Sequence, residues 1–199
     1  MDVTIFMQQM VNGFSLGSMY ALIAIGYTMV YGVLRLINFA HGDIMMVGGF
    51  LGYFGIAVLG LPFGAAVLLS IAGSAALGMI SDKIAYRPLR SAPKISLLIT
   101  AIGVSFFLEN AFNVFFGGVP RAFPVPPYME KMVELFGLTM PVSAILVPVI
   151  TAFLLVVILW VVFRTKYGMA IRALAFDVGT VNLMGIDANR IITMVFGIG

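Results

Sequence analysis

The sequence contains no cysteine, one histidine and one tryptophan, and charged residues make up only 10% of its 199 positions. The absence of cysteine excludes disulfides, thiolate metal ligands and a cysteine nucleophile, and a single histidine argues against an all-protein zinc site. The sequence also lacks a G-x-x-x-x-G-K-[ST] phosphate loop and any convincing Ser/His/Asp arrangement. We therefore expect no catalytic residues, no metal and no cofactor, and any ATP-driven step has to be powered by another chain.

Charge is scarce because the chain is apolar throughout. Hydrophobic residues make up 62% of the sequence and the mean hydropathy is +1.13, far outside the range of a soluble domain. The formal net charge is only +3, and the basic residues fall in loops between apolar segments. This distribution fits the positive-inside bias of membrane proteins better than a nucleic-acid footprint, so we expect an integral membrane protein with no nucleic-acid partner.

Long uncharged runs predict an all-α, polytopic transmembrane fold, since a helix needs about 20 apolar residues to cross the hydrocarbon. The expected spans run at about 7–30, 36–59, 63–80, 95–116 and 141–163, and a further span starts at 191. Because the sequence stops as this last span begins, we expect residues 1–199 to be the N-terminal part of one longer transmembrane domain.

Two spans contain notable glycines. Gly13 and Gly17 have the GxxxG spacing that allows close approach of another helix, although glycine is also simply common in membrane helices. In the 36–59 segment, Gly48, Gly49, Gly52 and Gly55 make a poor autonomous helix, so we expect it to be tightly packed, broken or re-entrant.

The distribution of lysine and arginine predicts the orientation. The 82–94 and 164–190 loops hold four basic residues each, against two in the 117–140 loop. The first two loops are therefore expected in the cytoplasm and the third outside, with an external amino terminus unless 36–59 is re-entrant. Within the external loop, the apolar positions Met129, Met132, Val133 and Phe136 suggest a surface-lying helix over 128–136.

The polar stretch 164–190 separates two apolar segments. Ile171, Leu174, Ala175 and Val178 recur at helical spacing and predict one apolar stripe on a short helix. Asp177 is a plausible N-cap for a second short helix, Gly185 can stop it in a left-handed conformation, and Asp187 can cap the next one. The pattern fits either a passive connector or a docking surface for a soluble partner, and solvated connectors are the commoner case.

Two groups of polar residues lie beside or within the spans. Asn38, His41, Gly42 and Asp43 lie at the start of the second span and form our candidate substrate pathway, because polar groups in a membrane often mark a transport route. The alternative is that Asn38 or Asp43 caps a helix and His41 is solvated. Glu109 is the one carboxylate within an apolar span; it is either a proton or cation relay or a solvated group near the outer interface.

Several motifs together resemble the permease subunits of ABC importers for branched-chain amino acids, and the resemblance covers nearly the whole chain. The most specific marker is LINFAHGD after a glycine-containing first span. The motifs are ALIAIGYTMVYG (21–32), LINFAHGD (36–43), AYRPLR (85–90), LITAIGVSFFLEN (98–110) and the RTKYGMAIRALAFD and LMGID parts of the 164–190 loop.

The resemblance implies a multi-pass permease of the bacterial inner membrane that works with four other subunits or proteins. These partners are two cytoplasmic ABC ATPase subunits, a second homologous permease chain and an external, periplasmic substrate-binding protein. It also implies that 164–190 contacts the ATPase. The positions that match the family loop are Gly168, Arg172, Ala173, Asp177, Gly185 and Ile186, and we assign Asp187 to the same ATPase-coupling loop. Val181 and Gly179 depart from the family pattern, which leaves the fine geometry of that contact undefined.

Three interpretations follow. The first is an importer permease for leucine, isoleucine and valine. The second keeps this architecture but changes the small-molecule substrate to urea, short amides or another amino acid. The third is a channel or ion-coupled secondary transporter that depends on Glu109 and has no ATPase partner.

Overall fold

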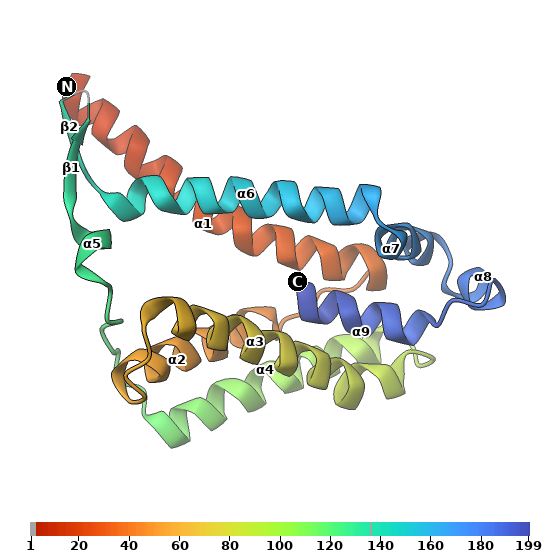
Figure 1. Ribbon diagram of the computed structural model, residues 1–199. Coiled ribbons are helices and arrows are strands. Elements are labelled where there is room, and N and C mark those ends of the chain that lie inside the picture. Colours follow the sequence, from red (N-terminus) through yellow and green to blue (C-terminus); the bar gives the residue numbers. More distant parts are fainter. Residues whose placement is uncertain (1–2, 136) are drawn as a thin grey trace.

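The computed structural model describes residues 3–135 and 137–199 as a helical bundle with one β-hairpin (Figure 1). The longer helices have these bounds: α1 Val3–Leu34, α2 His41–Ala57, α3 Phe63–Ser81, α4 Lys94–Phe116, α6 Val142–Arg164, α7 Lys166–Phe176 and α9 Ala188–Ile198. The short elements are η1 Asp82–Tyr86, η2 Arg87–Leu89, α5 Pro127–Glu130, β1 Met132–Leu135, β2 Leu138–Pro141 and α8 Val178–Leu183.

In the described part of the chain, four helices are long and apolar enough to cross a membrane. They are α1, α4, α6 and the helix formed by α3 with η1 and η2, which is 27 residues long. The prediction of an all-α, polytopic membrane fold is confirmed, with a single two-stranded hairpin as its exception. The second segment is shorter than the others, because α2 has 17 residues and starts only at His41.

Helices α1 and α6 lie side by side along one edge of the molecule (Figure 1). The Thr151 hydroxyl donates to the carbonyl oxygen of Ser18 at 3.3 Å, and the Gln8 amide donates to that of Thr139 at 3.0 Å. These contacts hold the start of α1 beside the hairpin. Gly13 and Gly17 have open space around them in the described structure, so no helix of this chain uses the GxxxG spacing.

Helix α2 packs closely on α3 through small residues. The Ser70 hydroxyl donates to the Gly48 carbonyl at 2.6 Å, and a methyl group at Gly55 would lie only 3.1 Å from the Cβ of Ala66. Small side chains at a helix contact let the two backbones approach. The glycines that weaken α2 as an isolated helix are therefore what allows it to pack tightly here.

The 35–57 segment traverses the bundle and does not turn back. Its first residue lies beside α7, because the Arg35 guanidinium donates to the Ala175 carbonyl at 2.6 Å. Its last turns lie beside the end of α4, where Phe50 and Phe54 stack on Phe116 with ring centroids 5.5 and 5.0 Å apart. A re-entrant segment would return to the α7 end, which α2 does not do.

The two basic loops, 82–94 and 164–190, meet at one end of the molecule, which we call the basic end. Arg90 of the first loop donates to the Asn189 side chain, which belongs to the second loop and to the first turn of α9. The hairpin and the start of α1 lie at the opposite end (Figure 1). The two basic loops therefore share the end opposite the start of α1; that this end faces the cytoplasm stays a prediction.

The largest buried apolar cluster lies at the basic end. It joins the last turns of α1 to η1, the first turns of α4, and helices α7, α8 and α9. Its fully or almost fully buried members include Tyr86, Leu174, Ile192 and Val195. The polar 164–190 segment is therefore fixed to the bundle by its own apolar side chains.

The surface-lying helix expected over 128–136 is wrong for the described residues. Helix α5 covers only Pro127–Glu130, and Met132–Leu135 then pairs antiparallel with Leu138–Pro141. Gly137 has a φ of 77°, a left-handed conformation that suits a tight hairpin turn. Backbone pairing between the two strands replaced the helical alternative; Phe136, also assigned to that helix, lies outside the described residues.

Candidate functional site

The connection between α1 and α2 is irregular and largely buried. Helix α1 ends at Leu34, and Arg35 has a φ of 53°, which reverses the direction of the chain. Asn38 is only 3% exposed. Its side-chain oxygen accepts from the Tyr86 hydroxyl at 2.7 Å and from the Ala40 N–H at 3.2 Å, while its Nδ2 has no partner among the described residues. Non-helical backbone at membrane depth is tolerated when protein surrounds it, as here.

Tyr86 reaches Asn38 because the helix that starts as α3 widens into the π-helical turn η1. Asp82 at the start of this turn and Tyr86 at its end are both fully buried. In a regular α-helix, residues four apart lie on one face but one turn displaced. The π-helical turn directs both polar side chains into the bundle, and such turns occur frequently at functional sites.

The other candidate pathway residues point in different directions. His41 packs edge-on against the Tyr27 ring of α1 at 5.7 Å, whereas Asp43 accepts a hydrogen bond from the Ser105 hydroxyl of α4. Gly42 is exposed. The structure therefore does not gather these residues with Asn38 into one pocket; it links each to a different helix. Neither the Asp43 carboxylate nor the Asn38 amide caps α2. The N-cap residue of α2 is Ala40, and no side chain forms a capping hydrogen bond there.

The 164–190 segment forms two short helices at the basic end. Thr165 accepts from the Gly168 N–H at 3.1 Å and so caps α7, and Asp177 accepts from the Gly179 N–H at 2.8 Å at the start of α8. Gly185 follows with a φ of 80°. Asp187 then caps α9 by accepting from the Asn189 and Arg190 N–H groups at 2.9 and 3.2 Å. The predicted bend at Asp177, the left-handed Gly185 and the Asp187 cap are all present.

The apolar stripe of this segment differs from the predicted one at its end. Ile171 and Leu174 are buried, but Val178 is 42% exposed, so its assignment to the stripe was wrong. The backbone at Asp177 is extended, so the helical spacing does not continue past it. Val181, one turn into α8, is 3% exposed and enters the core instead.

The matched loop residues fall into two groups. Gly168 is buried against the Val161 and Val162 carbonyl oxygens, where a methyl group would clash, and Ala173 and Ile186 pack against the core. Arg172 is exposed, with its guanidinium 5.3 Å from the centre of the Phe163 ring. Gly168, Ala173 and Ile186 therefore fix the conformation of the segment, whereas the Arg172 side chain is exposed on its surface.

Sequence reasoning missed three exposed apolar residues on the same segment. Phe176 is 88% exposed, Leu183 89% and Met184 74%. All three lie outside the predicted apolar stripe in an otherwise polar loop. This position is the sequence signal that could have identified them. We call Phe176, Leu183 and Met184 the apolar tip. Large exposed apolar side chains outside the membrane-spanning helices are candidates for a contact with another protein.

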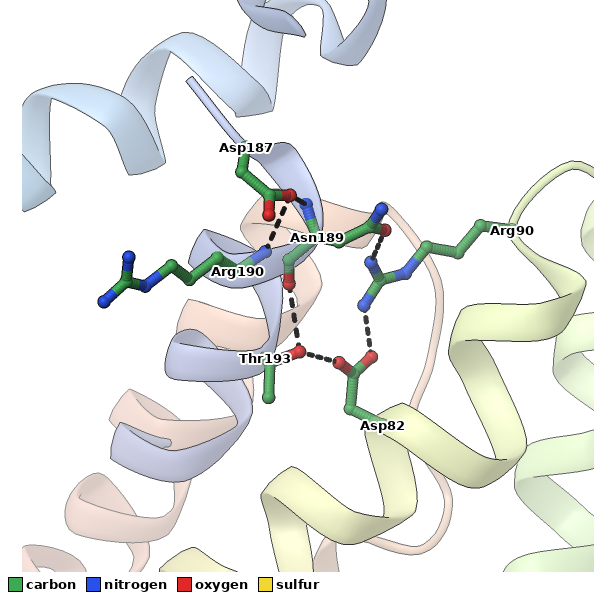
Figure 2. A network of polar contacts seen from close by, with 6 residues as sticks. All are labelled: Asp82, Arg90, Asp187, Asn189, Arg190 and Thr193. Atoms are coloured by element: carbon green, nitrogen blue, oxygen red, sulfur yellow. Dashed lines mark hydrogen bonds and ion pairs between the residues drawn. The ribbon is translucent and has the colours of Figure 1, made fainter. Parts of the chain in front are cut away.

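A buried polar network ties α9 to the η1–η2 turn (Figure 2). Arg90 forms an ion pair with Asp82 and donates to the Asn189 side chain. The Thr193 hydroxyl contacts the other Asp82 carboxylate oxygen and lies 2.9 Å from the Asn189 carbonyl oxygen. Because Asp82 is fully buried, these partners are what compensate for its loss of hydration.

Glu109 is exposed on α4. It lies on a cleft of about 550 Å³ near the end of α4 opposite the basic end. Arg121 lines the same cleft, with its guanidinium 5.8 and 5.9 Å from the ring centres of Tyr53 and Phe54. The carboxylate is therefore exposed on the surface of the bundle, and the choice between a relay and a solvated group stays a prediction.

The chain matches a family described as the permease component of branched-chain amino acid transport systems, over residues 9–199. It is 38% identical to the high-affinity branched-chain amino acid transport system permease protein BraD of Pseudomonas aeruginosa over 205 residues. It is 38% identical to LivH of Escherichia coli and 37% identical to LivH of Salmonella typhimurium, which bear the same description, over 206 residues each. Each match covers 98% of this chain and 67% of the relative.

No solved structure matches the chain. The family match and the apolar helices agree with the architecture, because a permease component needs several membrane-crossing helices and no catalytic site. The chain belongs to the branched-chain amino acid transport permease family, and it is a multi-pass membrane transport component, not an enzyme.

Proposed function

We propose that this protein is the membrane-spanning permease subunit of an ATP-driven importer that carries branched-chain amino acids across the inner membrane. The names of its relatives, all high-affinity branched-chain amino acid permeases, support this cargo over urea or amides. The same names favour an importer over an ion-coupled transporter, and the exposure of Glu109 agrees with that preference.

The observation that carries the ATP-driven step is the two-sided character of the 164–190 segment. On one side, Ile171, Leu174 and Val181 belong to the core cluster. On the other, the apolar tip is exposed at the basic end. A segment that is fixed to the bundle and also exposes an apolar surface suits contact with a soluble subunit that moves.

The partners in this proposal are two cytoplasmic ABC ATPase subunits, a second homologous permease chain and an external substrate-binding protein. Gly168, Arg172, Ala173, Asp177, Gly185, Ile186 and Asp187, together with the apolar tip, form the ATPase-coupling segment. ATP binding moves the ATPase subunits, and the core transmits that displacement from α7 and α8 to α1, η1 and α9. Interfaces between packed elements convert such small shifts into discrete states.

Within the bundle, we propose that the substrate pathway includes Asn38, His41, Gly42 and Asp43, and that this displacement changes their positions. Asn38 is well placed for it, because Tyr86 and Ala40 hold its oxygen while Nδ2 is a buried donor without a partner. A buried donor that is unsatisfied in one state costs about 1–3 kcal/mol, and a second state or a polar substrate group that pairs it would be favoured.

The experiment is co-purification of the native full-length protein and its complex in mild detergent. We expect an ATPase subunit to be recovered, and expect the double variant Phe176→Ser and Leu183→Ser to lose it while still entering the membrane. The matched control is Val119→Ser in the 117–140 loop. Val119 is also apolar and is 77% exposed, and this variant should retain the ATPase subunit. Recovery of a stable protein without any ATPase would refute the importer proposal.

A further inference from the structure

A second cavity lies at the basic end, in the groove between α9 and the helix formed by α3, η1 and η2, and has a volume of about 560 Å³. Its lining includes three cationic and three large apolar side chains. They are Lys83, Arg87, Arg190, Met79, Met194 and Ile198.

These six residues have an order along the groove. Met79, Lys83 and Arg87 succeed one another along α3, η1 and η2, and all three line the cavity. Arg190, Met194 and Ile198 recur every four residues on one face of α9. The two helices are antiparallel. Gly197 packs against the Met79 side chain, with a methyl group at Gly197 placed 3.0 Å from its Cγ, while Thr193 contacts Asp82 further toward the basic end. The groove therefore runs from a cationic mouth at Arg87 and Arg190, past Lys83 and Met194, to an apolar interior at Met79 and Ile198, roughly 12 Å from the mouth along the helices.

The three cationic side chains at the mouth are available to bind an anion. None of Lys83, Arg87 and Arg190 forms an ion pair with a residue that the structure describes. Arg90 differs, because Asp82 and Asn189 hold its guanidinium; Figure 2 shows Arg190 pointing away from that network. Asp187 also lines the cavity, but one of its oxygens caps α9. Three cations and one carboxylate leave a formal charge of +2 at the mouth.

We propose that this groove binds an anionic phospholipid of the cytoplasmic leaflet. The phosphate lies among Lys83, Arg87 and Arg190, and an acyl chain follows Met79, Met194 and Ile198 toward the membrane interior. Basic pockets between membrane helices on the cytoplasmic side suit anionic headgroups. A free phosphate or a nucleotide would use only the cationic mouth, whereas the order of charge and apolarity along the groove fits an amphipathic ligand oriented as in the bilayer.

The test uses the complete native transporter, purified in mild detergent and titrated with phosphatidylglycerol, phosphatidylcholine or inorganic phosphate. Native mass spectrometry measures lipid retained per complex. A basic residue near an anionic headgroup contributes roughly five-fold to affinity, so the triple variant K83Q/R87Q/R190Q should bind phosphatidylglycerol on the order of 100-fold more weakly. Arg190→Gln alone, a milder change for folding, should weaken it about five-fold.

The control is K94Q/R164Q/K166Q, which removes the same charge from exposed positions at the same end but outside the groove. It should keep phosphatidylglycerol at the wild-type level. The proposal is overturned if the groove triple and the control triple bind this lipid equally, if phosphatidylcholine is retained as well as phosphatidylglycerol, or if millimolar inorganic phosphate displaces it. Its outcome does not depend on which substrate the transporter carries.

Discussion

The guanidinium of Arg90 forms an ion pair with the carboxylate of Asp82, a side chain with no exposure to solvent at the end of α3. Through Asn189, the same guanidinium reaches the first turn of α9. One arginine therefore both neutralises a buried charge and joins the first basic loop to the helix that follows the second.

Removing that arginine should be far more damaging than removing a neutral partner of Asp82. Arg90→Gln leaves a buried carboxylate without its cation and should destabilise the fold by about 3–5 kcal/mol. Thr193→Val removes one hydroxyl from the same carboxylate and should cost about 1 kcal/mol. Denaturation midpoints in detergent measure both. Equal destabilisation by the two variants would contradict the importance of the Arg90–Asp82 ion pair. Adding Asp82→Asn to Arg90→Gln should restore part of the lost stability.

The contact between α3 and α9 depends on the absence of a side chain at Gly78. A methyl group there would clash with the backbone carbonyl oxygen of Phe196, which cannot rotate away as a side chain can. Gly78→Ala should therefore destabilise the protein by about 1–3 kcal/mol. Gly64→Ala, in the same helix but with open space around it, should be neutral or slightly stabilising. Thermal unfolding of the two variants side by side tests this, and similar midpoints would contradict the close approach.

The left-handed conformation of Gly185 predicts an effect on coupling. Its φ of 80° is unfavourable for a β-branched residue by about 1–2 kcal/mol, whereas asparagine tolerates it. Gly185→Val should distort the turn between α8 and α9 and separate ATP hydrolysis from uptake, while Gly185→Asn should keep both. Substrate uptake per ATP hydrolysed, measured in proteoliposomes, is the readout. Unchanged coupling in the valine variant would argue against a role for this turn.

The proposed pathway residues can be tested together. Alanine at both Asn38 and Asp43 removes the acceptor of the Tyr86 hydroxyl and the acceptor of the Ser105 hydroxyl. We expect uptake to fall at least ten-fold, about 1.4 kcal/mol of barrier, at normal protein levels in the membrane. Ser105→Ala, which removes only the donor to Asp43, is the control and should have a smaller effect. Full transport in the double variant would exclude these residues from the pathway.

Local patterns predicted the helical elements well, because their signals are short-range. The Asp187 cap, the bend at Asp177 and the left-handed Gly185 each depend on a few neighbouring residues. The same short range explains two errors. The stripe through Val178 assumed one uninterrupted helix, and the helix assigned to 128–136 ignored a pairing partner that comes later in the chain.

The candidate site was harder to predict than the fold. Asn38, His41 and Asp43 are close in sequence, yet they contact Tyr86, Tyr27 and Ser105 on three different helices. The Asp82 network brings together residues more than 100 positions apart, and no local spacing indicates it. Proximity of polar residues in the sequence signalled that the region matters, but tertiary contacts decide where each side chain lies.

The placement of the main buried cluster at the basic end has a mechanical consequence. The helices share apolar contacts at the basic end, where α1, α4, α7, α8 and α9 meet, while the start of α1 and the end of α4 lie well apart at the opposite end (Figure 1). Such a bundle has its pivot at the basic end, so a small rotation there produces a larger displacement at the opposite end. Amide hydrogen exchange should accordingly be slowest around Tyr86 and Ile192 and quicken with distance from them.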